Sequence, residues 1–253
     1  MLSHVSKWLR SPGRGAAATR AAGPCLEALE DRLVPTGMLD LTTRGAVGDV
    51  NGAIFRQSDP QPTGTGVIRS FVRLQTSNGK ATVEQGYNTD NRPLQFDENN
   101  SPQFTRSLRL SDLPTEDVGG VTYRVFLLDI NQKSSQPYLS LDELRLFVGD
   151  APNLSGYQTA TNQLPGAALV YDLDAGGDSW VKLDSRLNSG SGSGDMLLYV
   201  PDADFTAQGA HPYVYLYSKF GVNFAGNAGF EEWAPATPAQ TAAGGAISGT
   251  VYV

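Results

Sequence analysis

The stretch PYVYLYSKF, residues 212–220, alternates aromatic and smaller side chains in the pattern typical of an extended strand. Successive side chains of a strand point to opposite faces of its sheet. One face would carry Tyr213, Tyr215 and Tyr217, and the other would carry Val214, Leu216 and Ser218. Because both sets are rich in residues that favour protein interiors, we expect this strand to be covered on both sides.

Further strand-like runs lie on the N-terminal side of this stretch. The longest is GVTYRVFLLDIN, residues 120–131, and SLDELRLFV, residues 140–148, favours a strand because Gly149 to Pro152 ends it. Shorter runs lie at 66–75, 79–86, 168–173, 179–183 and 196–200. The first two flank Asn78-Gly79, a dipeptide typical of tight hairpins, which predicts that these two strands pair antiparallel.

Together these runs predict an all-β fold, an antiparallel and jelly-roll-like β-sandwich of roughly nine or ten strands. The composition agrees, since 28 glycines and 15 prolines suit a chain with many turns. A length of 253 residues allows one main domain with tails. The expected segments are a targeting or disordered segment at 1–37, a linker or irregular edge at 38–65, the sandwich at 66–233, a linker at 234–245 and the start of a further β-domain at 246–253.

Charge and rare residues argue against several classes of function. The net charge of −7 disfavours nucleic acid or an anionic membrane as a partner. Residues 1–37 carry five basic and three acidic side chains, a balance of +2 that leaves −9 for the remainder. No apolar run is long enough to span a membrane. Cys25 is the only cysteine, and His4 and His211 are the only histidines, which leaves little material for a nucleophilic triad or a zinc hydrolase.

The stretch YDLDAGGDSWVKLDSRLNSGSGSGD, residues 171–195, concentrates acidic residues and glycines between two strands. Ca²⁺ binds about six to eight oxygen ligands from loops that curl around the ion. The candidate ligands for this possible cofactor are Asp172, Asp174, Asp178 and Asp195. The EF-hand pattern is absent, because the twelfth position counted from Asp172 is Leu183 rather than glutamate. The alternative is a hairpin whose Gly176-Gly177 turn joins two strands of the sandwich.

Aromatic side chains offer a different candidate site. Trp180, Trp233 and Tyr215 are the candidates for a platform on which sugar rings stack, although an aromatic stripe at strand spacing is more often part of a core. Paired acids such as Asp142-Glu143 and Glu231-Glu232 supply the residue types of a glycosidase. Adjacent strand residues point to opposite faces, so we expect these pairs to be solvated and the protein not to be an enzyme. Glu231 and Glu232 would join the acidic loop only if the fold brought them near it.

The segment LEALEDRL, Leu26–Leu33, follows a basic start rich in alanine and glycine. It resembles the LEPR-type motif near the N-terminus of large exported and surface proteins of planctomycete bacteria, with Ala28 and Asp31 as departures from the strict form. The final residues ISGTVYV, 247–253, resemble the opening strand of B-type domains in serine-aspartate-repeat adhesins. These resemblances imply an extracellular or cell-surface location and a modular, non-catalytic architecture.

We therefore expect a non-catalytic structural or adhesive module of a bacterial envelope protein, with calcium stabilising its loops. Its partners would be other envelope proteins or polysaccharide. A carbohydrate-binding module that uses the aromatic face is the alternative, and a glycosidase is a more distant one.

Overall fold

The computed structural model describes residues 37–58, 68–75, 82–188, 194–227 and 229–237. The chain divides into two units, Met1–Leu33 and Val34–Val253, and all described residues belong to the second. The expected targeting segment, most of the C-terminal linker and the final predicted strand lie outside the described residues. Within the described ranges, no helix is long and apolar enough to cross a bilayer.

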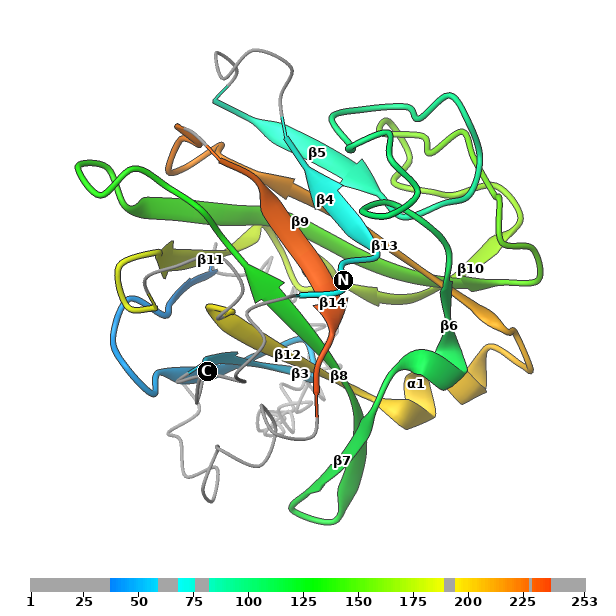
Figure 1. Ribbon diagram of the computed structural model, residues 1–253. Coiled ribbons are helices and arrows are strands. Elements are labelled where there is room, and N and C mark those ends of the chain that lie inside the picture. The colour runs from blue at the N-terminus through cyan, green and yellow to red at the C-terminus, as the bar shows by residue number, and fades with distance from the viewer. Residues whose placement is uncertain (1–36, 59–67, 76–81, 189–193, 228, 238–253) are drawn as a thin grey trace, which may run out of the picture. The chain divides into compact units, whose positions relative to one another are not determined.

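Two sheets of seven strands each confirm the predicted all-β sandwich (Figure 1). In the first, which we call sheet A, the strand order is β1 (Gly37–Asp40), β11 (Ser179–Asp184), β9 (Tyr138–Gly149), β13 (Tyr213–Phe220) and β5 (Glu84–Tyr87), with β10 (Ala167–Asp172) also on β9 and β6 (Leu108–Arg109) also on β13. The pair β1–β11 is parallel, whereas the other pairs described in this sheet are antiparallel.

The second sheet, sheet B, is antiparallel throughout its described pairs. Its order is β2 (Val47–Val50), β3 (Ala53–Gln57), β12 (Met196–Pro201), β8 (Val121–Asp129), β14 (Glu231–Pro235) and β4 (Val72–Leu74), with β7 (Thr115–Val118) also on β8. Two short helices follow strands, a 3-10 turn at Leu110–Asp112 and α1 at Asp202–Ala207.

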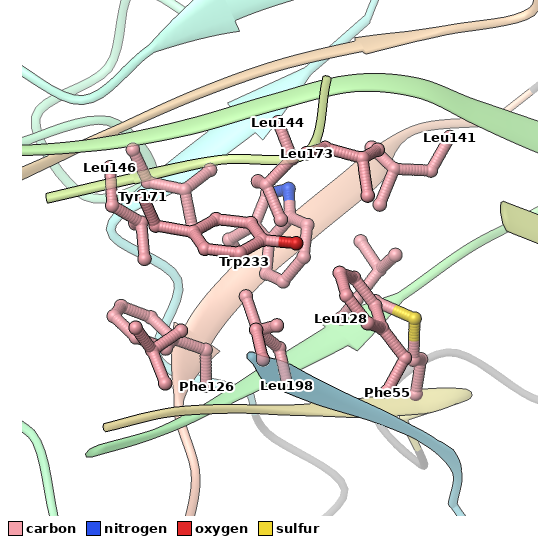
Figure 2. Packing of buried hydrophobic residues seen from close by; sticks show 14 of the residues in the cluster. Phe55, Phe126, Leu128, Leu141, Leu144, Leu146, Tyr171, Leu173, Leu198 and Trp233 are labelled. Atoms are coloured by element: carbon pink, nitrogen blue, oxygen red, sulfur yellow. The ribbon is translucent and has the colours of Figure 1, made fainter. Parts of the chain in front are cut away.

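One hydrophobic core fills the space between the sheets. Alternation along each strand sends every second side chain into this core, as the predicted strand pattern requires. Figure 2 shows Trp233 of sheet B at its centre, between Leu144 and Leu173 on one side and Phe126 and Leu198 on the other. The indole Nε1 of Trp233 donates a hydrogen bond to Ser218 Oγ at 3.1 Å, which satisfies the one polar atom of this ring.

A second cluster of buried side chains covers the outer face of sheet A, the face that points away from the main core. Its buried members are Tyr87, Phe147, Tyr157, Leu164, Tyr215 and Tyr217. Two loops provide the cover, since Phe96 comes from the loop after β5, and Leu154 and Tyr157 come from the loop after β9. The tyrosines of β13 therefore pack outward while Val214 and Leu216 pack into the main core, which confirms that this strand is covered on both sides.

Three predicted features differ from the structure. The predicted hairpin around Asn78-Gly79 is wrong in its pairing, because β4 pairs with β14 in sheet B while β5 pairs with β13 in sheet A. The turn itself, within residues 76–81, lies outside the described residues. For the predicted linker or irregular edge at 38–65, the linker is wrong in its first part, which contains strands: β1 and β2 lie at edges of the two sheets, and β3 lies inside sheet B.

The third difference concerns the predicted linker at 234–245. Its first two residues, Ala234 and Pro235, belong to β14, which lies between β8 and β4 inside sheet B. Four of the five residues of β14 are buried, on one face of the sheet or the other, so its sequence shows no alternation of polar and apolar residues. Such a strand can be identified only from the strands with which it pairs.

Candidate functional site

A buried arginine organises the acidic stretch after β10. The side chain of Arg145, in the middle of β9, is only 3% exposed, and it contacts three carboxylates. Arg145 Nε lies 3.1 Å from Asp172 Oδ2, Nη2 lies 3.0 Å from Asp174 Oδ2, and Nη1 lies 2.6 Å from Glu143 Oε2. Lys219 Nζ approaches the other oxygen of Glu143 at 2.8 Å. We call these five residues the Arg145 network.

Electrostatic effects within the Arg145 network oppose one another. Burial disfavours the charged guanidinium, but Asp172 and Glu143 hold the pKa of Arg145 above its ordinary value. Burial raises the pKa of Asp174 to about 6, and the Ser179 N–H and Arg145 offset this only in part. For Glu143, the hydrogen bonds and charges of Lys219 and Arg145 overcome burial and lower the pKa. The network therefore compensates charges that would be costly to bury alone.

The structure does not gather the four predicted calcium ligands. Asp172 and Asp174 bind Arg145, so a guanidinium already occupies the space between them. Asp178 is exposed, and its carbonyl oxygen accepts a hydrogen bond from Gly37 N at 3.1 Å. Asp195 lies at the start of β12, in the other sheet, with different neighbours. Within the described ranges, no group of three or more histidine, cysteine or acidic side chains is placed to hold a metal ion.

The alternative prediction for this stretch, a hairpin, is also wrong. β10 and β11 do not pair with each other. Both strands pair with β9: β10 pairs with its last residues and β11 with its first. The segment with Gly176-Gly177 therefore connects two strands that lie one after the other along β9.

Because Arg145 supplies the positive charge, we expect calcium to have no effect on the stability of this loop. Melting temperature in EDTA and in millimolar CaCl₂ should agree for the whole chain, since a ligand that binds only the folded state would raise it. If calcium raised the melting temperature of the unmodified protein but not of the Asp172→Asn variant, the ion would be competing with Arg145 for these carboxylates.

A second group of acidic side chains lies where β5, β8, β12 and β14 meet. Glu231 is buried, shares a side-chain hydrogen bond with Glu84, and accepts one from Gln132 Nε2 at 2.7 Å. Burial, together with Glu84 and the charge of Asp129, raises the pKa of Glu231 well above its ordinary value. A hydrogen bond between two carboxyl groups needs a proton on one of them. The contact between Glu84 and Glu231 is therefore favoured when one of the two groups is protonated.

Asp195 belongs to the same end of the sandwich. Its Oδ2 accepts a hydrogen bond from Ile130 N at 2.8 Å, while its Oδ1 is buried without a hydrogen-bond partner in the part of the chain that the structure describes. Burial raises the pKa of Asp195 well above its ordinary value, and the charges of Asp129 and Asp184 add to this effect. Glu232 is separate, because it points to Arg73 at 2.6 Å.

The predicted aromatic platform is wrong for two of its three members. Trp233 is 0% exposed at the centre of the main core, and Tyr215 is 1% exposed beneath the loop after β9. The hydroxyl of Tyr215 accepts from Leu154 N at 3.1 Å and donates to the carbonyl oxygen of Ala151. Neither ring can present a face to a sugar, because each is buried by its own domain.

Trp180 is the third member, and it is only partly buried on the outer face of sheet A. Its ring lies 5.7 Å from that of Phe224, centroid to centroid. Lys182 Nζ lies 4.7 Å from the ring centroid of Tyr138 and 4.6 Å from that of Phe224, within the range of cation–π attraction. These contacts hold the loop after β13 against the sheet, which gives the aromatic residues a structural role.

No protein-family model, curated protein or solved structure matches this chain. Its function must therefore be inferred from the contacts of its own side chains.

Arg145 is the residue that the sequence prediction missed. The signal for it is present, since an arginine stands in SLDELRLFV among residues of a buried strand. A charge within a strand covered on both faces requires carboxylate partners, and YDLD is an acidic segment at the end of the next predicted strand. That rule would have linked Arg145 to Asp172 and Asp174 instead of to a metal ion.

Proposed function

We propose that this protein is a non-catalytic structural or adhesive module of a bacterial extracellular or cell-surface protein. The observation that carries the proposal is the use of its charged side chains inside the fold. Arg145 neutralises the acidic stretch after β10, and Arg73 binds Glu232. Side chains that are engaged in this way stabilise a fold and are poor candidates for proton transfer to a substrate.

The paired acids support the same proposal, although the prediction that they are solvated is wrong for Asp142, Glu231 and Glu232, which are buried. Asp142 holds the loop after β13, because its carboxylate accepts hydrogen bonds from Val222 N at 2.7 Å and from Asn223 N at 3.1 Å. Its neighbour Glu143 belongs to the Arg145 network. Glu98, which burial shields from solvent, accepts from Tyr87 N at 3.0 Å and Phe96 N at 2.8 Å. A glycosidase needs two carboxyl groups that flank a substrate, whereas these groups fasten loops to strands.

The surface location rests on the resemblance of Leu26–Leu33 to an N-terminal motif of exported planctomycete proteins, and that segment lies outside the described residues. Partners of such a module would be other envelope proteins or polysaccharide. The acidic net charge of −7 agrees with a partner other than nucleic acid.

Surface labelling of whole cells tests this proposal. An antibody raised against the sandwich should label intact cells that produce the full chain, and external protease should remove the label. Labelling that appears only after the cells are permeabilised would contradict a surface location. Hydrolysis of a glycan by the purified full chain, abolished by Glu143→Gln, would contradict the non-catalytic role.

A further inference from the structure

A pocket of about 460 Å³ opens on the outer face of sheet A, next to the Arg145 network. Its lining comes from two segments, the turn at 161–166 and the strand β10 with its neighbour β9. Asp172 lies in its wall, and Phe147 and Leu164 connect it to the aromatic cluster. This volume falls within the range of about 300–1,000 Å³ that is typical of small-molecule sites.

Hydrogen bonds fasten the turn that forms one wall. Gln158 and Gln163 form an isolated bridge, with Gln158 N donating to Gln163 O at 2.8 Å. Asn162 has a left-handed backbone with φ of 55°, which asparagine tolerates better than most residues. With its side-chain amide assigned in the orientation that satisfies both polar atoms, Asn162 donates to Thr159 O at 3.1 Å and accepts from Arg145 Nη2 at 3.0 Å.

Arg145 therefore joins both walls of the pocket. The same guanidinium that contacts Asn162 in the turn contacts Asp172 at the end of β10. The pocket is thus formed before any ligand arrives, and binding does not have to order its walls.

The lining combines hydrogen-bonding groups with an apolar wall. Thr161, Gln163 and Asp172 supply a hydroxyl, an amide and a carboxylate. Leu169, which is 46% exposed, and Pro165 supply the apolar surface. The Asp172 carboxylate accepts hydrogen bonds from Arg145 Nε and Asp174 N, and its remaining lone pairs can accept from hydroxyl groups. The Arg145 network contains three carboxylates and two cationic groups, and its net charge of −1 disfavours an anion.

We infer that this pocket binds a short neutral saccharide, whose hydroxyl groups would meet Gln163, Thr161 and Asp172 while a CH face packs on Leu169. Neutral sugars present many hydroxyl groups and apolar patches within one small molecule, and this lining offers both kinds of contact. The inference concerns a different surface from the predicted aromatic platform, and it does not depend on where the protein is located.

NMR titration of the ¹⁵N-labelled full chain tests it. The probes are glucose, galactose, mannose and N-acetylglucosamine, each as the monosaccharide and as a β-1,4-linked disaccharide, with glucuronic acid as the charged comparison. At least one neutral probe should shift the backbone signals of residues 161–172 with a dissociation constant of about 1 mM or tighter. Glucuronic acid should bind at least tenfold more weakly than glucose, on the order of 1.4 kcal/mol.

Two exposed positions provide the variants, and a third provides the control. Gln163→Ala and Leu169→Glu should each weaken binding at least about tenfold, which corresponds to 1.4 kcal/mol. Val222→Glu is the matched control, since Val222 is also exposed, at 56%, and does not line the pocket. Unchanged spectra outside the pocket establish that each variant is folded.

Three results would overturn the inference. The first is the absence of any shift at residues 161–172 with every neutral probe. The second is binding that survives both pocket variants and instead shifts signals around Trp180. The third is glucuronic acid binding as tightly as glucose. A surface protein that fails this titration would leave the proposed function standing, because surface labelling is measured separately.

Discussion

Replacing Arg145 by methionine is expected to lower the free energy of unfolding by about 3–5 kcal/mol, the usual cost of removing one partner of a buried ion pair. The variant would keep Asp172, Asp174 and Glu143 in place, with only Lys219 left to compensate their charge. For a domain of this size, each kcal/mol lowers the melting temperature by about 2–4 °C. Differential scanning calorimetry of the two proteins at pH 7 measures the difference.

Arg186→Met is the matched control for this variant. Arg186 also binds an aspartate, Asp184, at 2.7 Å, but its own side chain is 51% exposed. The Asp184 side chain is only 5% exposed, but it would keep its hydrogen bond from the backbone N of residue 186 and the nearby charge of Lys182, so a smaller decrease in melting temperature is expected. Equal decreases in melting temperature for Arg145→Met and Arg186→Met would show that the burial of Arg145 does not determine how much it stabilises the fold.

A further test combines Arg145→Met with Asp172→Asn and Asp174→Asn. Removing the carboxylate charges together with the guanidinium avoids a buried unpaired charge, so this triple variant should recover part of the lost stability. No recovery would mean that Arg145 acts by packing its aliphatic stem rather than by its charge.

Glu231→Gln is expected to stabilise the protein at neutral pH and to have little effect at acidic pH. The pKa of Glu231 is raised in the folded state, mainly by burial and also by Glu84 and Asp129. A carboxyl group with a raised pKa contributes stability that is present below its unfolded pKa of about 4.3 and is lost as the pH rises through the folded pKa. Glutamine keeps the uncharged form at every pH, so the variant escapes this loss.

Chemical denaturation at pH 4, 5, 6, 7 and 8 measures the effect. The advantage of Glu231→Gln should grow with pH by up to about 1.4 kcal/mol for each unit by which the folded pKa is raised. Asp178→Asn is the control, because Asp178 is exposed. The stability of this variant should depend on pH in the same way as that of the unmodified protein. A Glu231→Gln variant that is destabilised equally at all five pH values would show that Glu231 is needed in its ionised form.

The strands themselves could be predicted from the sequence where alternation is strong. β13 is the best case, because its tyrosines and its aliphatic residues separate onto two faces that the structure buries in two different clusters. The fold class follows from such runs. β8, β9, β11 and β12 also form within a few residues of the predicted runs.

Strand partners and site contacts could not be predicted in the same way. β4 and β5 are close in sequence, and an Asn-Gly turn signal favours their pairing, yet burial of Val72 and Leu74 beside β14 places them in different sheets. Local turn signals carry no information about a partner strand more than 150 residues away. The same limit applies to Arg145, whose partners lie 27 and 29 residues further along the chain.

The position of β14 has a consequence for how the protein is made. Residues 231–235 are the last strand that the structure describes, yet they lie between β8 and β4 and carry the tryptophan at the centre of the core. A ribosome releases the chain from its N-terminus onward, at about 5–20 residues per second. Until residue 235 has emerged, β4 lacks its described partner and the two sheets enclose an unfilled space. We therefore expect the sandwich to stay open until β14 has been synthesised and to close in a late step of its own folding.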